Sequence, residues 1–204
     1  MPARRLILAS TSPYRRELLQ RLRLPFEVRA PDVDEAPLAN ESPRELALRL
    51  ALAKAEAVAA LDEEAIVIGS DQVADLDGVA IGKPGDHARA TGQLRTMRGR
   101  SVVFHTAVAV ACRASGFRAA EVASVAVRFR DLDDAAIEHY LRTEQPYDCA
   151  GSAKAETLGI ALLDAIESDD PTALIGLPLI RTCTLLRRAG IDPLAPAAAS
   201  MATR

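Results

Sequence analysis

The first twenty residues place a strand signal directly before a helix start, and this order most constrains the fold. The four apolar residues Leu6–Ala9 are typical of a buried strand, and the polar run Ser10-Thr11-Ser12-Pro13 follows at once. Ser12 suits a helix N-cap and Pro13 suits the first helical position. A strand that leads straight into a helix predicts an α/β fold. We therefore expect one α/β domain with a mixed sheet over residues 1–194.

The rest of the chain alternates strand and helix signals. The capping box Ser42-Pro43-Arg44-Glu45 predicts a helix that continues to about Leu61. The tail, 195–204, is rich in Pro and Ala and is expected to be disordered. The other expected elements are strands at 26–30, 65–69, 101–113, 117–130 and 159–166, a hairpin over 73–81 that turns at Asp77-Gly78, and helices at 14–22, 86–97, 133–143 and 177–189.

Composition and charge narrow the classes of function. The net charge is −3, whereas a protein that coats nucleic acid needs a strongly positive surface. A nucleic-acid binder that uses the arginine-rich first 30 residues stays an alternative, disfavoured by this charge and by an aromatic content of only 3%. We expect a small-molecule partner and no nucleic acid. The sequence leaves the oligomeric state open, with a homodimer as one alternative.

Cysteine usage and hydropathy predict the compartment. Cys112, Cys149 and Cys183 lie far apart without a CxxC motif, which indicates neither a zinc ribbon nor a disulfide framework. Such usage favours a reducing cytoplasm. The apolar run after Arg4 and Arg5 is too short for a signal peptide, and no stretch approaches the roughly 18 apolar residues of a membrane span. We therefore expect a cytoplasmic protein without membrane contact.

The strand-to-helix junction predicts an anion site. A helix N-terminus presents free backbone N–H groups and a positive dipole end, and Ser10 and Ser12 add hydroxyl groups there. Arg15 and Arg16 follow in the first turn, and a guanidinium can bind two phosphate oxygens at once. The alternative is an ordinary capped helix with exposed arginines.

A carboxylate at a strand end is a second candidate. In Gly69-Ser70-Asp71-Gln72 the acid follows a strand expected to be buried, and open α/β sheets bind ligands at the carboxyl ends of their strands. Such a carboxylate can hold a hard divalent cation or accept a proton from water. The alternative is an Asp that caps a turn.

Weaker signals come from charged residues in expected loops and helices. Lys83 lies in a Gly-Lys-Pro turn, while Glu35 and Lys54 are isolated charges. Lys154 and Glu156 alternate in a loop of small residues and are expected to face one cleft together. Each of these side chains has an ordinary alternative as a solvated charge. A serine hydrolase is not indicated, since Ser10 and Ser12 lack both an elbow motif and a paired His.

Taken in order, these segments resemble the Maf family of nucleoside triphosphate pyrophosphatases. Asp71-Gln72 and the run 149–152 are similar to the YceF-type branch, whose preferred substrate is 7-methyl-GTP. The chain departs from that branch at Tyr14, where Trp is frequent, and at Ala153 and Leu158, where Phe is common. The matching stretches are LILASTSPYRRELL (6–19), Val33-Asp34-Glu35, ESPRELALRLALAKA (41–55), VIGSDQV (67–73), GKP (82–84), CAGSAKAETLGI (149–160) and GLPL (176–179).

The resemblance implies an elongated, inosine-triphosphatase-like α/β fold with a deep cleft between two lobes. It implies hydrolysis between the α- and β-phosphates of a nucleoside triphosphate, with Mg²⁺ or Mn²⁺ as cofactor. The position matching Asp71 is then the proton acceptor, and those matching Tyr14, Gln72 and Glu156 select the substrate. We further expect Glu35 and Asp71 to hold the metal, and the phosphates to be bound by Ser10, Ser12, Arg15, Lys54 and Lys83.

Two alternatives to 7-methyl-GTP hydrolysis stay open at this point. One is the same chemistry on dTTP, UTP or another modified nucleotide. The other is a nucleotide-binding regulator without catalysis, because Maf proteins are also associated with inhibited septum formation. Release of pyrophosphate would distinguish an enzyme from such a regulator.

Overall fold

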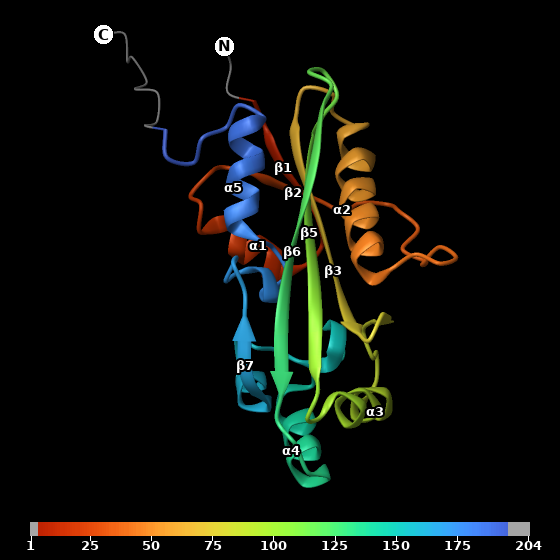
Figure 1. Ribbon diagram of the computed structural model, residues 1–204. Coiled ribbons are helices and arrows are strands. Elements are labelled where there is room, and N and C mark those ends of the chain that lie inside the picture. Colours follow the sequence, from red (N-terminus) through yellow and green to blue (C-terminus); the bar gives the residue numbers. More distant parts are fainter. Residues whose placement is uncertain (1–3, 196–204) are drawn as a thin grey trace.

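The computed structural model describes residues 4–195, and a mixed sheet runs the length of this part of the chain (Figure 1). Within it the strands are β1 (Leu6–Ala9), β2 (Glu27–Arg29), β3 (Ile66–Leu76), β4 (Val79–Ile81), β5 (Ser101–Cys112), β6 (Phe117–Phe129) and β7 (Leu163–Glu167). The order is β2-β1-β3-β5-β6-β7, with β4 paired to β3. β1 lies parallel to β2 and β3, while β3, β5, β6 and β7 are antiparallel neighbours. The predicted mixed α/β fold is confirmed.

Helices cover both faces of the sheet at one end and gather at its other end (Figure 1). They are α1 (Pro13–Gln20), α2 (Pro43–Ala59), α3 (His87–Met97), α4 (Asp134–Glu144) and α5 (Leu179–Arg188), with short 3₁₀ turns η1 (Ala150–Ser152), η2 (Leu158–Leu162) and η3 (Ala173–Ile175). The predicted caps are present: Ser12 accepts a hydrogen bond from the Arg15 N–H, and Ser42 and Glu45 form the capping box. Within residues 4–195 no helix is long and apolar enough to cross a membrane.

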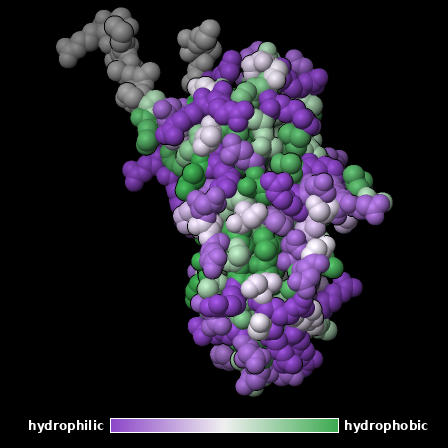
Figure 2. Space-filling view, in the orientation of Figure 1, coloured by the Kyte–Doolittle hydropathy of each residue, from purple (hydrophilic) through white to green (hydrophobic). Residues whose placement is uncertain are grey.

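Three apolar clusters divide the molecule into two lobes. In the first lobe, side chains alternate along β1, so that Ile7 packs under α2 while Leu8 packs under α1 and α5. In the second lobe, Phe104 and Phe129 of the long strands pack against α3 and α4. Because β3, β5 and β6 continue through both lobes, the molecule is elongated (Figure 1). Figure 2 shows hydrophilic residues over most of one face, as expected when apolar residues, 49% of the chain, supply the core.

Helix α2 packs on the sheet at unusually short range because one strand residue has no side chain. A Cβ atom on Gly69 would lie 2.6 Å from the backbone nitrogen of Ala55 and closer still to the Ala51 carbonyl oxygen. The alanines of α2 that face the sheet are fully buried. Glycine in the strand and alanines in the helix thus form this interface in a chain with few aromatic residues. The close approach of helix and strand brings Lys54 of α2 beside Asp71 of β3.

Two strand predictions were wrong in their limits. The strand expected at 65–69 continues without a break to Leu76, because β5 pairs antiparallel with β3 from Val67 to Asp75. Asp71 therefore lies inside a strand and not after its end. The segment expected as strand 159–166 begins as η2, and β7 starts only at Leu163. The tail 196–204, predicted to be disordered, lies outside the described residues.

Candidate functional site

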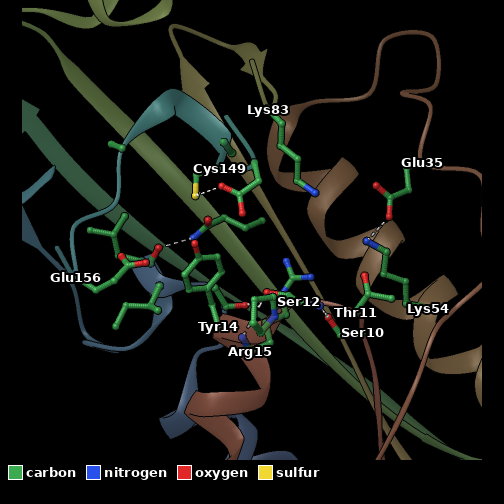
Figure 3. A pocket seen from close by; sticks show the side chains of 18 of the residues that line it. Ser10, Thr11, Ser12, Tyr14, Arg15, Glu35, Lys54, Lys83, Cys149 and Glu156 are labelled. Atoms are coloured by element: carbon green, nitrogen blue, oxygen red, sulfur yellow. Dashed lines mark hydrogen bonds and ion pairs between the residues drawn. The ribbon is translucent and has the colours of Figure 1, made fainter. Parts of the chain in front are cut away.

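A cavity of about 310 Å³ lies between the two lobes (Figure 3). The first lobe contributes the β1–α1 junction, Glu35 and Lys54, and the second contributes the turn after β4 and the segment 148–156. Of the residues predicted for the site, nine line this cavity: Ser10, Ser12, Tyr14, Arg15, Glu35, Lys54, Gln72, Lys83 and Glu156. Asp71 does not, although it contacts one residue that does.

The β1–α1 junction forms the predicted anion cradle. Ser10 Oγ accepts a hydrogen bond from the Ser12 N–H at 3.1 Å, and Ser12 Oγ accepts one from the Arg15 N–H at 3.4 Å. Arg15 Nε donates to the Gly176 carbonyl oxygen at 2.9 Å. Burial lowers the pKa of Arg15, and the carboxylates of Asp71 and Glu35 oppose that effect. An arginine keeps its charge in such a setting, so the cradle is positive.

Lys54 lies between the two carboxylates expected to bind a metal. Its Nζ atom is 2.6 Å from Glu35 Oε1 and 2.7 Å from Asp71 Oδ1. The Lys54 and Asp71 side chains are only 6% and 10% exposed, whereas Glu35 is 57% exposed. Burial alone would raise the pKa of Glu35, but Lys54, Lys83 and Arg15 together lower it. The ionised form of Glu35 is thus stabilised by three cations, Lys54, Lys83 and Arg15.

Asp71 is placed by the different lengths of two neighbouring strands. β1 ends at Ala9, opposite Gly69, whereas β3 runs on beyond that point. The hydroxyl-rich junction after Ala9 therefore emerges beside Ser70 and Asp71. Asp71 itself is largely buried, and its carboxylate accepts a hydrogen bond from Lys54, which lines the cavity.

The donors expected for a divalent cation are these two carboxylates, Glu35 and Asp71. Within residues 4–195 no group of three or more His, Cys, Asp or Glu side chains could hold a metal ion. In nucleotide sites Mg²⁺ is typically bound by one or two carboxylates together with phosphate oxygens and water. Glu35 and Asp71 fit that pattern for a cation that arrives with a triphosphate, and Lys54 already neutralises part of their charge.

The opposite end of the cavity carries an aromatic ring and an acid (Figure 3). Tyr14 is half-buried, and Lys154 Nζ lies 5.9 Å from the centre of its ring. The expectation that Lys154 and Glu156 face the cleft together is wrong, because only Glu156 lines it. Lys154 turns back and pairs with Asp148 at 3.6 Å. Burial raises the pKa of Glu156, which means that its ionised form lacks sufficient solvation.

Gln72 is occupied by backbone groups. Its Nε2 atom, with two protons to donate, lies within hydrogen-bond distance of three acceptors: the carbonyl oxygens of Ala173 and Leu174 at 3.0 and 2.9 Å, and Thr106 Oγ1 at 2.9 Å. Since both carbonyl oxygens can only accept, the group that faces them must be the amide NH₂. Only the carbonyl oxygen of Gln72 is left for a ligand, so a role in substrate selection stays a prediction.

Comparison with known proteins decides the family. Residues 5–189 match the family model described as "Maf-like protein". The chain belongs to the Maf family. A curated relative of this Maf chain, the "7-methyl-GTP pyrophosphatase" of Albidiferax ferrireducens, is 66% identical over 191 residues, which are 94% of this chain and 96% of the relative. Proteins of the same name from Polaromonas sp. and Cupriavidus metallidurans are 67% and 60% identical, over 93% and 91% of this chain and 86% and 93% of their own.

Parts of this Maf site had little or no local signal in the sequence. Asp148 lines the cavity without having been predicted, and Cys149 was named only as the first residue of the matching stretch 149–160. Burial, followed by the neighbouring Asp148, raises the pKa of the Cys149 thiol to about 12. Residues 174–176 form part of the wall, although nothing in their composition marks a binding segment. The match of GLPL at 176–179 to the family pattern was the only hint that this turn belongs to the site.

Proposed function

We propose that this Maf protein hydrolyses 7-methyl-GTP between the α- and β-phosphates and releases 7-methyl-GMP and pyrophosphate. The observation that carries the proposal is the polarity of the cavity. Arg15, Lys54 and Lys83 lie toward one end of the cavity, whereas Glu156 and Tyr14 lie toward the other (Figure 3). A ligand with a polyanionic tail and a flat cationic base complements this distribution. The names of the relatives, at 60–67% identity, support the same substrate.

At the phosphate end, three cations face two carboxylates, so bound phosphate oxygens would meet an excess of positive charge. Arg15 offers a guanidinium fork, and the first turn of α1 offers backbone N–H groups. Lys83 forms no ion pair within residues 4–195, which leaves its ammonium group available to the leaving pyrophosphate. Stabilisation of the charge on that group is the main requirement of such a reaction.

At the base end, methylation of N7 gives guanine a delocalised positive charge. Stacking on Tyr14 would then gain a cation–π contribution of about 0.5–2 kcal/mol. Glu156 has the acceptor oxygens for the N–H edge of guanine, and a cationic base would relieve the poor solvation that raises its pKa. Plain GTP offers the same edge without the charge, so it should bind less well.

We assign metal binding to Asp71 and Glu35, and proton acceptance to Asp71. Mg²⁺ or Mn²⁺ held by Glu35 and Asp71 would supply Lewis-acid polarisation of the phosphate oxygens. Asp71 contacts Lys54 at 2.7 Å and orients it, and we propose Asp71 as the group that accepts the proton of the attacking water. Three free cysteines support the proposed reducing, cytoplasmic location.

The test is a panel of nucleoside triphosphates scored for pyrophosphate release in the presence of Mg²⁺ or Mn²⁺. The panel includes 7-methyl-GTP, GTP, dTTP and UTP. We expect the highest kcat/KM with 7-methyl-GTP. Faster turnover of dTTP or UTP would replace the substrate assignment, and nucleotide binding without pyrophosphate release would favour the regulator.

Glu156→Gln tests the base end separately. Loss of the carboxylate should reduce the preference for 7-methyl-GTP over GTP by about 10-fold or more, since a hydrogen bond to a charged group is worth about 1.5–3 kcal/mol. Glu17→Gln is a matched control, because Glu17 is a largely exposed carboxylate of α1 outside the cavity lining. An unchanged preference in Glu156→Gln would refute this reading of the base end.

A further inference from the structure

The turn that contains η3 is fastened to the sheet by three polar side chains. Gln72 donates to the carbonyl oxygens of Ala173 and Leu174, and Thr106 Oγ1 donates to that of Ala173 at 2.9 Å. Ser70 Oγ lies 2.8 Å from the Ala107 carbonyl oxygen of β5 and 3.0 Å from that of Gly176, so its one hydroxyl proton is shared between the strand and the turn. Ser70 and Thr106 are completely buried. Polar side chains buried this deeply are costly unless their hydrogen bonds are made, so this network holds the turn in one geometry.

The same turn holds an arginine of the cavity. The Gly176 carbonyl oxygen accepts one hydrogen bond from Arg15 Nε and lies within hydrogen-bond distance of Ser70 Oγ. Gly176 has φ +125°, a backbone conformation that only glycine adopts readily, and this conformation ends the turn. Arg15 Nε is thereby bound to protein, which leaves the terminal nitrogens of the guanidinium for a ligand. The direction of the guanidinium plane follows from the position of one backbone carbonyl group.

We propose that Ser70 and Gln72 are positioning residues, which fix the 173–176 turn so that the Gly176 carbonyl group aims Arg15 at the triphosphate. The inference rests on the proposed function in one respect: it takes Arg15 as a phosphate ligand. It gives Gln72 a different task from substrate selection. Gln72 acts on the phosphate end of the cavity, through a turn, and does not need to contact the base.

The first experiment compares two substrates in Gln72→Met. Methionine has a similar length but lacks the NH₂ group that holds Ala173 and Leu174. If Gln72 positions Arg15, kcat/KM should fall by about 10- to 100-fold for both 7-methyl-GTP and GTP, because misplacement of a binding group by about 1 Å has effects of this size. The ratio of the two values should stay at its wild-type level. A changed ratio, or unchanged kcat/KM for both substrates, would overturn the proposal.

The second experiment asks whether Ser70 acts through Arg15. Ser70→Ala and Arg15→Met are measured singly and together, and the double variant should be no worse than Arg15→Met alone. Additive losses would mean that Ser70 acts independently and would overturn the proposal. Thr182→Val is the matched control: Thr182 is also completely buried and donates to a carbonyl oxygen, that of Pro178, but lies outside the network. If Ser70→Ala does not fold, Gln72→Met replaces it in the cycle.

Binding of inorganic triphosphate separates this inference from the proposed function. Calorimetry should show weaker triphosphate binding in Gln72→Met and Ser70→Ala than in wild type and Thr182→Val. This result would support the positioning role even if wild-type protein hydrolysed none of the nucleotides tested. Equal triphosphate affinities in all four proteins would contradict it, whatever the activity.

Discussion

Replacement of Gly69 by alanine tests the close packing that brings Lys54 to Asp71. The added Cβ atom would lie 2.6 Å from the Ala55 nitrogen, whereas ordinary contact begins at 3.4 Å. The neighbours are backbone atoms of α2, so no side chain can rotate away to make room. The helix must move from the sheet by about 1 Å, and that movement would also lengthen the Lys54–Asp71 ion pair.

The cost follows from the packing of this interface. Extra methyl groups in a well-packed core typically cost about 1–3 kcal/mol, and close contacts with two backbone atoms of α2 place the cost of Gly69→Ala near the upper value. We expect the free energy of unfolding to fall by about 3 kcal/mol. For a chain of this size, with a urea m-value of about 2 kcal/mol/M, the midpoint should fall by about 1.5 M. Urea titration followed by circular dichroism measures this shift directly.

Gly92→Ala is the matched control for that experiment. Gly92 lies inside α3, and a Cβ atom there would meet nothing within 4 Å. Because alanine favours helix over glycine, this variant should gain about 0.5–1 kcal/mol. The same chemical change should thus have opposite signs at the two positions. A Gly69→Ala protein as stable as wild type would show that α2 does not pack as closely as described.

The remaining predictions concern the Glu35–Lys54–Asp71 group. Asp71→Asn should keep the fold and lose about 10²- to 10⁴-fold in rate, the usual range for a general base, and near-normal turnover would refute its role. Lys54→Met should lower the free energy of unfolding by about 3–5 kcal/mol, measured in urea, since Asp71 would be left buried without its cation. The pKa of Glu35 is lowered in the folded protein from its ordinary value of 4.5 by Lys54, Lys83 and Arg15 against the effect of burial. The ionised form therefore stabilises the fold above that value, and the stability advantage of wild type over Glu35→Gln should shrink as the pH falls through the lowered pKa; an advantage independent of pH down to acid unfolding would contradict this.

The sequence was sufficient where the signal is local. The caps at Ser12 and Ser42, the hairpin turn at Asp77 and the end of β1 at Ala9 all follow from a few adjacent residues, and the structure confirms them. The anion cradle belongs to the same class, because a strand, a hydroxyl-rich turn and a helix start are contiguous in the chain. Lys83 and Glu156 had only weak local signals, and their roles in the site came from the resemblance to a family.

The errors arose where a distant segment decides the local structure. The apolar run from Gly159 was expected to be a strand, but a Cβ atom on Gly159 would lie 2.7 Å from the backbone nitrogen of Lys154, and this close turn continues into η2. The length of β3 depends on its pairing with β5. The position of Lys154 depends on Tyr14 and Asp148, two residues of the cavity wall that its ammonium group contacts. No window of adjacent residues contains such information.

The unequal lengths of β1 and β3 and the absence of a side chain at Gly69 explain the position of the cavity. β1 stops opposite Gly69 while β3 continues to Leu76, so the anion cradle opens beside the antiparallel part of β3. The absence of a side chain at Gly69 lets α2 approach at the same level, which inserts Lys54 between the strand and the cavity. A cation, an acid and a helix N-terminus therefore meet because of backbone packing at one residue. Gly69→Ala should accordingly impair catalysis in the protein that still folds, although Gly69 contacts no ligand.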